Sequence, residues 1–297
     1  KIGIHDNFFN LGGYSLLTIQ LTSRINKAFS LSVIVSWVFE NLTIAEQAAS
    51  IGEDEESLKV YQPILNLKEL EGEMPLFLVH PGSGGAEAYR DLSVLFKNAN
   101  KLISGVYGIE SYNLNHLDQP VSNMKLLAAK YIEYIKEIQP KGPCLIGGWS
   151  LGGSIAYEIA QQLKDQGEAV LGVYLIDTMG VESDIWRKAQ DLSSNDDTVK
   201  ILKEMGATDE DIEKLLKLKP IEQKLLSTYS LLELEGIEVI LMNALNRQIS
   251  QDKKVDQVYK KSHKLMNKPN NGWDKYAKNL TVHEFDADHM SIMLDEK

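Results

Sequence analysis

The sequence contains a single cysteine, Cys144, among its 297 residues. One cysteine excludes an internal disulfide and fits a reducing compartment, so we expect a cytoplasmic protein. Cys144 stands in the apolar run 143–146, and this setting predicts a buried strand residue. No apolar run approaches the roughly 20 residues that span a bilayer, and the N-terminus has no signal-peptide pattern. Because the first residue is Lys1 and not Met, we expect the chain to be part of a longer polypeptide.

The sequence is also poor in positive charge. It has 31 Lys and Arg residues against 42 Asp and Glu residues, which gives a formal net charge of −11. A surface this acidic repels phosphate backbones and anionic lipids, so we expect neither a nucleic acid nor a membrane as a partner. The hydrophobic fraction of 43% and the charged fraction of 25% are those of an ordinary globular protein.

The length of the chain predicts one large domain or two unequal ones. Residues 1–51 are predicted to form short helices, because apolar residues recur there at helical spacing. Thr43 and Glu46 form a capping box that begins the second of these helices. An acidic run follows, and we interpret residues 52–62 as a linker between this segment and residues 63–297.

In the longer segment, short β-rich runs alternate with helical stretches. Strands are predicted at 76–80, 103–107, 144–147, 170–176, 237–242 and 280–285, and helices at 86–97, 122–139 and 151–166. This alternation predicts an α/β fold with a mainly parallel sheet covered on both faces. Residues 181–230 carry helical signals but no strand. We interpret this insertion as a lid over a site, with plain helical decoration as the alternative.

The most informative motif is Gly-Trp-Ser-Leu-Gly at residues 148–152, which matches the pattern G-x-S-x-G. A chance match is expected about 0.1 times in a chain of this length, so the context decides. The motif follows an apolar run and precedes helix-forming residues, and strand, tight turn and helix are the setting of a nucleophile elbow. We therefore predict Ser150 as a nucleophile, with a Gly-rich turn around an inert serine as the alternative.

A serine nucleophile needs a base to take its proton and a carboxylate to hold that base in the right tautomer. On the α/β-hydrolase fold the acid follows the serine in the chain, and the histidine follows the acid. Asp177 ends the next predicted strand, at the sheet edge where open α/β sheets place their sites. We predict Asp177 as the acid; the alternative is an aspartate that caps a turn.

The base must be one of six histidines, of which three precede the serine in the chain. His263 lies in a Lys-rich helical stretch, where we expect an exposed position, and His283 lies inside a strand. His289 follows the last predicted strand in a loop, and we predict it as the base. A metal site formed with Asp286 and Asp288 lacks a usual ligand spacing, so we expect no metal.

An acyl-transfer site also needs backbone N–H donors for the oxyanion. The amide of Leu151, directly after the nucleophile, is predicted as one donor. The loop His-Pro-Gly-Ser-Gly-Gly at residues 80–85 is predicted to supply the other. A phosphate-binding glycine loop is the competing interpretation, but no Gly-Lys-Ser/Thr follows.

A second serine, Ser15, is predicted from the residues alone as the N-cap of a helix. However, residues 6–17, Asp-Asn-Phe-Phe-Asn-Leu-Gly-Gly-Tyr-Ser-Leu-Leu, resemble the carrier-protein motif of peptide and polyketide synthases. Residues 39–45 resemble the start of the last carrier helix. The resemblance implies a small all-α carrier domain over residues 1–51, without its first helix, and 4′-phosphopantetheine attached to Ser15. A helix start suits this group, because it favours a phosphate.

Residues 61–297 resemble the type I thioesterases that follow such carriers. The elbow Gly-Trp-Ser-Leu-Gly-Gly, the loop His-Pro-Gly-Ser-Gly-Gly and the segment Asp-His-Met-Ser-Ile-Met carry this resemblance. It implies an α/β-hydrolase fold with a helical lid at 181–230. The site residues that it implies are the nucleophile Ser150, the acid Asp177, the base His289 and the oxyanion-hole amides of Ser83 and Leu151.

These features predict the chain-terminating thioesterase of a nonribosomal peptide synthetase or polyketide synthase, which releases its acyl or peptidyl chain by hydrolysis or cyclisation. The expected partners are upstream synthase domains in the same polypeptide, a phosphopantetheinyl transferase and an acyl or peptidyl thioester substrate. One alternative is a stand-alone serine esterase or lipase with a chance helical prefix. The other is a non-catalytic interaction module on the hydrolase fold.

Overall fold

The computed structural model of the chain divides into two compact units, Lys1–Leu65 and Asn66–Lys297. The structure describes residues 2–8, 11, 15–29, 31, 33, 37–38, 41–51, 61–82, 84–96, 101–192, 194–204, 207, 209–246, 252–266 and 268–293. Most of the predicted linker, residues 52–60, lies outside the described residues.

The first unit contains helices α1 (Ser15–Phe29) and α3 (Ile44–Ile51). The capping box predicted at the start of α3 is confirmed, because Thr43 N–H donates to Glu46 Oε2 at 2.9 Å and Glu46 N–H donates to Thr43 Oγ1 at 3.2 Å. A small apolar core holds this unit together, built from Ile25, Val33, Trp37 and Val38. The helices among the described residues of this unit agree with the all-α character that the sequence predicts.

The second unit is built on a seven-stranded sheet with the strand order β1-β3-β2-β4-β5-β6-β7. Its strands are β1 (Ile64–Glu69), β2 (Met74–Val79), β3 (Ile103–Ile109), β4 (Cys144–Trp149), β5 (Val170–Ile176), β6 (Leu234–Ala244) and β7 (Ala277–Phe285). All neighbouring pairs from β3 to β7 are parallel. The α/β fold class predicted from the sequence is thus confirmed.

Each strand predicted from the sequence is present, and β1 is an additional strand that the pattern did not indicate. The central strands β2 and β4 are buried along their whole length. Such continuous apolar runs are typical of parallel strands covered on both faces. Strand β1 is short and half-exposed, with only Leu65 and Leu67 buried. Its Asn, Lys and Glu residues weaken the apolar alternation that would predict a strand.

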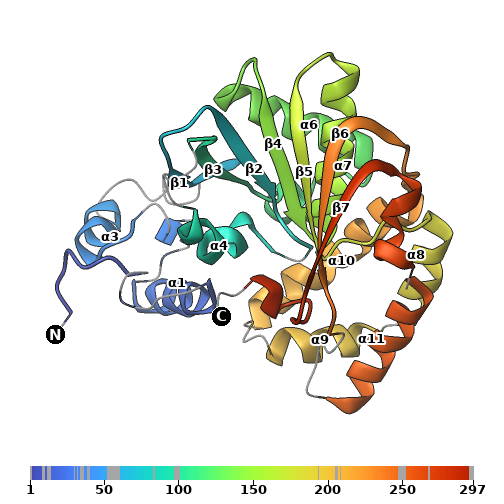
Figure 1. Ribbon diagram of the computed structural model, residues 1–297. Coiled ribbons are helices and arrows are strands. Elements are labelled where there is room, and N and C mark those ends of the chain that lie inside the picture. Colours follow the sequence, from blue (N-terminus) through green and yellow to red (C-terminus); the bar gives the residue numbers. More distant parts are fainter. Residues whose placement is uncertain are drawn as a thin grey trace. The chain divides into compact units, whose positions relative to one another are not determined.

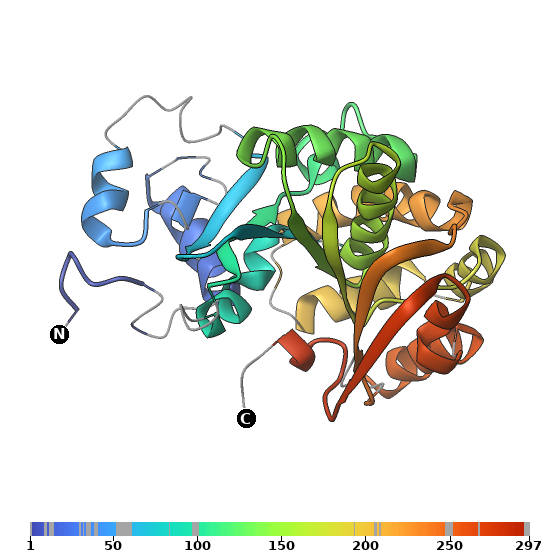
Figure 2. The same cartoon turned by 45° about the horizontal axis from the view of Figure 1, so that its top comes forward.

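Helices α6 (Met124–Ile138) and α7 (Leu151–Asp165) pack against each other, and α7 packs on β4 and β5. Figures 1 and 2 show both helices along one face of the sheet. The helix predicted at 122–139 is α6; its side chains Leu127, Tyr131 and Ile135 form a buried apolar stripe, whereas Ile138 in the last turn is 42% exposed. The helix predicted at 86–97 is a 3-10 turn, η2 (Ala86–Tyr89), followed by α4 (Arg90–Leu95).

Helices α8, α9, α10 and α11 lie beyond the carboxyl ends of the central strands (Figure 1). Three of them fall within the predicted insertion 181–230: α8 (Ser183–Gln190), α9 (Asn195–Glu204) and α10 (Asp209–Thr228). The fourth, α11 (Lys253–Met266), contacts α8 and α9. Smaller elements are α5 (Tyr112–Asn115), η4 (Pro269–Lys275) and η5 (Ser291–Met293).

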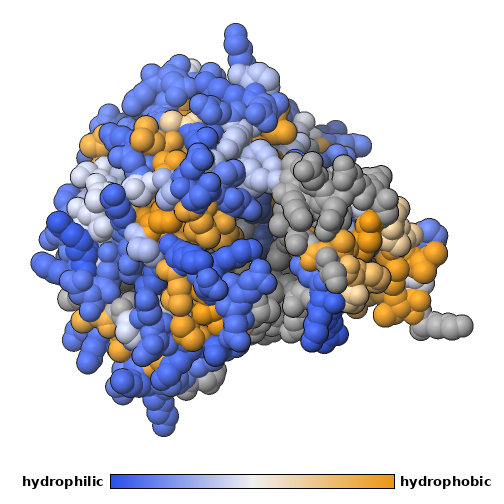
Figure 3. Space-filling model, turned by 180° about the vertical axis from the view of Figure 1, so that it is seen from behind, coloured by the Kyte–Doolittle hydropathy of each residue, from blue (hydrophilic) through white to orange (hydrophobic). Residues whose placement is uncertain are grey.

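The surface of the second unit carries the polar character that its composition predicts. Hydrophilic residues cover most of its face in Figure 3, and hydrophobic residues occur between them in small groups. Among the described residues, no helix combines the length and apolar character needed to cross a membrane.

Candidate active site

The predicted nucleophile stands at a strained turn between strand β4 and helix α7. Ser150 follows Trp149, the last residue of β4, and has φ 55° and ψ −119°. A residue other than glycine rarely adopts a positive φ, and such strain clusters at functional sites. The Ser150 N–H donates to Ile176 O at 2.9 Å, so the parallel pairing with β5 extends to the serine. Strand, strained serine and helix together have the geometry of a nucleophile elbow, the local structure that the sequence predicts around Ser150.

Two glycines of the motif are required by close backbone contacts. A Cβ added to Gly152 would lie 2.3 Å from Val79 O and 2.6 Å from His80 O. A Cβ added to Gly148 would lie 2.2 Å from the carbonyl carbon of Gly152. Because the obstructing atoms are backbone atoms, neither position accepts a larger residue without a shift of the strand or the helix. These glycines therefore let α7 begin directly against the ends of β2 and β4.

Asp177 and His289, predicted as acid and base, are hydrogen-bonded to each other although 112 residues separate them. The distance from His289 Nδ1 to Asp177 Oδ2 is 2.7 Å. The other carboxylate oxygen, Oδ1, accepts the N–H of Ala244 at 3.2 Å. Asp177 is only 2% exposed, whereas the His289 side chain is 17% exposed. An ionised Asp177 makes Nδ1 the protonated nitrogen of a neutral His289 ring, which leaves Nε2 as the proton acceptor.

The short turn that carries His289 is fixed by the neighbouring aspartate. Asp288 Oδ1 accepts the N–H groups of Met290 and Ser291, both at 2.9 Å. The Asp288 N–H donates to Ser291 Oγ, also at 2.9 Å. The His289 ring in addition lies 5.1 Å from the Trp149 ring, centroid to centroid. Among the described residues, no group of His, Cys, Asp or Glu side chains is arranged to hold a metal ion.

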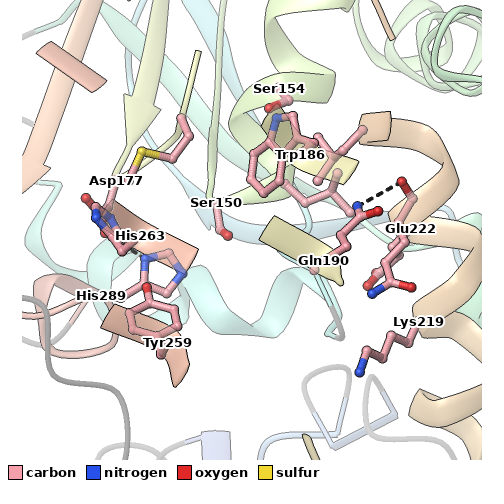
Figure 4. Close-up of a pocket in the computed structure, with 15 residues that line it drawn as sticks. Ser150, Ser154, Asp177, Trp186, Gln190, Lys219, Glu222, Tyr259, His263 and His289 are labelled. Carbon is pink, nitrogen blue, oxygen red and sulfur yellow. Dashed lines mark hydrogen bonds and ion pairs between the residues drawn. The ribbon is translucent and has the colours of Figure 1, made fainter. Parts of the chain in front are cut away.

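Ser150, Asp177 and His289 line one cavity of about 270 Å³. Figure 4 shows Ser150 between the Asp177–His289 pair on one side and residues of the helical insertion on the other. Within the described part of the chain, no hydrogen bond joins Ser150 Oγ to His289. Catalytic hydrogen bonds are often long without substrate and shorten when it binds. The cavity wall formed by helices α8, α10 and α11 includes Trp186, Gln190, Lys219, Glu222, Tyr259 and His263.

Of the two predicted oxyanion donors, Leu151 is among the described residues and Ser83 is not. Leu151 is the first residue of α7 and lines the cavity, so its backbone lies at the positive end of the helix dipole. Ser83, predicted as the second donor, lies outside the described residues. The adjacent Gly82 also lines the cavity, and a Cβ on it would lie 3.5 Å from Leu151 Cβ. The loop after β2 therefore reaches the start of α7.

Two buried side chains that the sequence did not indicate support this loop. His80 Nε2 lies 2.8 Å from Tyr131 Oη, and His80 Nδ1 lies 2.8 Å from Pro81 O. Burial lowers the pKa of His80 to about 4, so the ring is neutral at physiological pH. Tyr89, also fully buried, donates to Val79 O and accepts the Trp149 N–H at 2.7 Å. These contacts join the end of β2 to the residue that precedes Ser150.

The prediction of an exposed His263 is wrong. We expected an exposed residue in a Lys-rich helix, but His263 is only 5% exposed and lines the cavity. Its ring lies 5.9 Å from that of Tyr259, one turn earlier on α11. The lysines of α11 occupy the outer face of the helix. The hydrophobic and aromatic residues between them form the opposite face, which points inward.

Comparisons with known proteins agree with the fold and identify the family of the chain. The model of the thioesterase domain matches residues 74–297, and that of the phosphopantetheine attachment site matches residues 1–51. The chain therefore belongs to the thioesterase domain family, whose members are hydrolases. Its second family match makes it a carrier–thioesterase pair of the kind found in nonribosomal peptide synthetases.

Two curated relatives illustrate this similarity. The chain is 35% identical over 179 residues to the dimodular nonribosomal peptide synthase of Bacillus subtilis (strain 168), covering 60% of the chain. It is 33% identical over 186 residues to enterobactin synthase component F of Escherichia coli (strain K12), covering 62%. The chain spans only 7% and 14% of the lengths of these two relatives.

Two solved structures are also similar. A four-domain nonribosomal peptide synthetase, holo-AB3403 bound to AMP and glycine, matches the whole chain with a TM-score of 0.62 and 26% identity, over 24% of its own length. The thioesterase domain NocB matches 78% of the chain, over 91% of its own length, with a TM-score of 0.57 and 23% identity. The second likeness shows the fold alone.

The carrier family implies a covalently attached phosphopantetheine, and the described residues fit that group. Ser15 is the first residue of α1, a helix of 15 residues whose first turn contains no acidic side chain. The partial positive charge at this helix end favours a phosphate, and no nearby carboxylate in that turn opposes it.

Proposed function

We propose that the chain is the terminating end of a modular synthase, in which Ser150 takes the acyl or peptidyl chain from the carrier and releases it. The main support is the hydrogen-bonded pair of Asp177 and His289 in one cavity with the strained Ser150. The carrier match in the same chain supports a substrate that arrives on a neighbouring segment. Tethering of this kind gives a local concentration of about a millimolar, so weak docking suffices.

The proposed mechanism begins with proton transfer from Ser150 Oγ to His289 Nε2. As the proton leaves, Oγ forms a bond to the carbonyl carbon of the acyl thioester. Asp177 keeps the second ring nitrogen protonated and stabilises the imidazolium that forms. The backbone amides of Leu151 and of the loop after β2 stabilise the oxyanion, with Ser83 the proposed second donor.

Breakdown of the tetrahedral intermediate completes the transfer. The carbon–sulfur bond breaks, His289 returns its proton to the departing sulfur, and the acyl group remains on Ser150. Water then attacks the ester with His289 as base, or an internal hydroxyl or amine of the acyl chain attacks and closes a ring. In either case the bond between the acyl carbon and Ser150 Oγ breaks, and His289 returns the proton to Oγ. Phosphopantetheine on Ser15 supplies the thiol that holds the acyl chain as a thioester before transfer. Upstream synthase domains and a phosphopantetheinyl transferase are the proposed protein partners.

The helices of the 181–230 insertion are proposed to act as a lid. Residues of α8 and α10 face Ser150 across the cavity, so movement of these helices would change access to the nucleophile. Closure over the acyl-enzyme would exclude bulk water and favour attack by the substrate's own nucleophile.

The test is to load the chain with a phosphopantetheinyl transferase and an acyl-CoA and follow its intact mass with time. The wild type should lose the acyl group, whereas Ser150→Ala should retain it on the carrier and Ser15→Ala should never acquire it. Ser154, which lines the same cavity one turn along α7, provides the matched control Ser154→Ala. Release that persists in Ser150→Ala would contradict the proposed nucleophile.

The same experiment distinguishes the proposed function from the stand-alone esterase alternative. An esterase with a chance helical prefix would hydrolyse simple soluble esters rapidly and would not be modified at Ser15. A fluorophosphonate that labels Ser150 but not Ser154 excludes the non-catalytic alternative.

A further inference from the structure

The hydroxyl of Thr178 is a buried polar group that the proposed mechanism does not use. Thr178 follows Asp177 directly and is fully buried. Its Oγ1 lies 3.2 Å from Ser150 O and 3.1 Å from Ile176 O, so its single proton is shared between two carbonyl oxygens. This side chain therefore connects the segment that carries the acid with the nucleophile at the end of β4.

Neither carbonyl oxygen depends on this hydroxyl for a hydrogen bond. Ile176 O accepts the Ser150 N–H at 2.9 Å, and Ser150 O accepts the Gly153 N–H at 3.2 Å. Backbone donors therefore already satisfy both acceptors, and burial of the Thr178 hydroxyl is not explained by a carbonyl that would otherwise lack a partner. What the hydroxyl adds is a second donor that fixes the direction of the Ser150 carbonyl.

The Ser150 carbonyl belongs to the same peptide group as the Leu151 N–H, the amide proposed to stabilise the oxyanion. Because this group is planar and trans, its C=O and N–H point in opposite directions. The Leu151 N–H lies in the first turn of α7, where a helix offers no intrahelical acceptor, and Leu151 lines the cavity. A donor that holds Ser150 O therefore also sets the direction of the Leu151 N–H. It polarises the peptide group as well, which strengthens that N–H as a donor.

The surroundings hold Thr178 in this position. Its carbonyl oxygen accepts the indole N–H of Trp273 at 2.9 Å and the side-chain amide of Asn271 at 3.3 Å. At its side chain, a Cβ added to Gly153 would overlap Thr178 Oγ1. The last glycine of the motif Gly-Trp-Ser-Leu-Gly-Gly therefore leaves the space that the hydroxyl occupies.

We propose that Thr178 is a positioning residue, whose hydroxyl holds the peptide group between Ser150 and Leu151 so that the Leu151 N–H is directed at the oxyanion. The inference rests on the proposed function, since it takes this amide as a donor in acyl transfer. Because Thr178 is fully buried, it acts through the peptide group and not on the substrate. Its effect should therefore appear in the transition state and leave binding of the ground state unchanged.

Turnover of an acyl-pantetheine thioester by the full chain provides the first test, with the straight-chain acyl group that the wild type releases fastest. Thr178→Val replaces the hydroxyl with a methyl group, and both carbonyl oxygens keep their backbone donors. Loss of a whole oxyanion donor lowers kcat by about 10²–10³-fold, and a misdirected donor loses part of this. Thr178→Val should therefore lower kcat about 10-fold or more, with KM within about 2-fold of the wild type. Thr178→Ala should show the same loss, whereas Thr178→Ser keeps the hydroxyl and should remain within about 3-fold of the wild-type kcat.

Binding of an oxyanion analogue provides a readout that a merely structural role would not change. The trifluoromethyl ketone analogue of the same acyl-pantetheine forms a bond to Ser150 Oγ, its carbonyl oxygen becomes an oxyanion, and the Ser150 proton passes to His289. The matching amide analogue keeps its neutral carbonyl. By calorimetry, Thr178→Val should bind the ketone about 10-fold or more weakly than the wild type does, and the amide equally tightly.

Ser93→Ala is the matched control, because it also removes a buried hydroxyl that donates to a backbone carbonyl. Ser93 is 1% exposed, and its Oγ donates to Arg90 O at 2.6 Å within α4. The kcat of this variant and its affinity for the ketone should equal those of the wild type, whatever loss of stability urea denaturation shows.

The outcomes separate this inference from the proposed function. If Thr178→Val keeps the kcat and the ketone affinity of the wild type, or loses affinity for ketone and amide alike, the inference is overturned while the proposed function stands. A loss of kcat as large in Thr178→Ser as in Thr178→Val has the same consequence. If a fluorophosphonate does not label Ser150 of the wild type, the proposed function fails and the inference fails with it.

Discussion

Replacing Asp177 with asparagine is the sharpest test of the pair that Asp177 forms with His289. In the protein, Asp177 Oδ2 is 2.7 Å from His289 Nδ1, and Oδ1 accepts the Ala244 N–H at 3.2 Å. An amide group has one acceptor and one donor side, so it cannot satisfy both contacts as the carboxylate does. Either its donor faces His289 or its donor faces Ala244.

Each orientation has a calculable cost. With the donor facing His289, Nδ1 must accept and the proton moves to Nε2, so the ring cannot take a proton from Ser150. A wrong tautomer of this kind costs about 10⁴-fold in rate, or about 5 kcal/mol of transition-state stabilisation. With the donor facing the Ala244 N–H, a buried donor is left unsatisfied, which costs about 1–3 kcal/mol of folding stability. Because the first orientation avoids this cost, we expect the rate to suffer more than the stability.

Two assays measure the two costs. The first assay measures how well His289 takes the proton of Ser150. It follows the rate of Ser150 modification by a fluorophosphonate, detected by intact mass, and the rate of acyl release. The second assay is urea denaturation, which measures the free energy of unfolding. Asp286→Asn, in the same turn as His289 but exposed, is the control and should behave as wild type. A rate for Asp177→Asn within tenfold of the wild-type rate would refute the assignment of Asp177 as the orienting acid.

Three further predictions concern the buried groups around the elbow. Because burial lowers the pKa of His80 to about 4, the unfolded chain binds a proton below about pH 6.5 that the folded chain does not. Stability should therefore fall by about 3 kcal/mol as the pH is lowered from 6.5 to 4, and His80→Asn should flatten this dependence in urea titrations. Tyr89→Phe leaves Val79 O and the Trp149 N–H without their partner and should cost about 2–4 kcal/mol in the same assay. Gly152→Ala places a Cβ 2.3 Å from Val79 O and should cost at least about 3 kcal/mol or prevent folding.

Two of these substitutions, Tyr89→Phe and Gly152→Ala, have a control within the chain. Tyr107→Phe removes a hydroxyl from a ring that stacks on Phe77 at 5.5 Å, and it should cost less than Tyr89→Phe. Gly172→Ala adds a Cβ whose nearest neighbour is 3.4 Å away, so it should be tolerated where Gly152→Ala is not. Equal losses of unfolding free energy within either pair of variants would contradict these predictions. So would a pH dependence of stability that is the same with and without His80.

The parts of the site that the sequence predicts are those with a local signal. Ser150 stands in a motif between a strand and a helix, and Asp177 stands at the end of the next strand. The meeting of Asp177 with His289 follows from topology, because parallel strands deliver their carboxyl ends to one edge of the sheet. Local pattern and chain order therefore suffice to predict which residues come together there.

The opposite wall of the cavity has no such signal. Glu222 and His263 lie in helices rich in charged residues, and nothing in their spacing indicates which side chains turn inward. Their orientation is decided by packing of α8 against α10 and α11, which depends on the whole insertion. His263 is buried for this reason, because one face of the Lys-rich helix α11 is covered by α8.

The strain at the site explains why the elbow depends so strongly on the sheet. Ser150 with φ 55° and Asp177 with φ 39° follow the ends of neighbouring strands, where Trp149 of β4 pairs with Ile176 of β5. Each positive φ costs about 1 kcal/mol or more, and it persists only where the surroundings fix it. Here the fixing contacts are hydrogen bonds one residue beyond each strand, from Ser150 N–H to Ile176 O at 2.9 Å and from Asp177 N–H to Met242 O at 2.7 Å. A substitution that loosens the ends of β4, β5 or β6 should therefore relax both residues together and reduce acylation of Ser150 before it unfolds the domain.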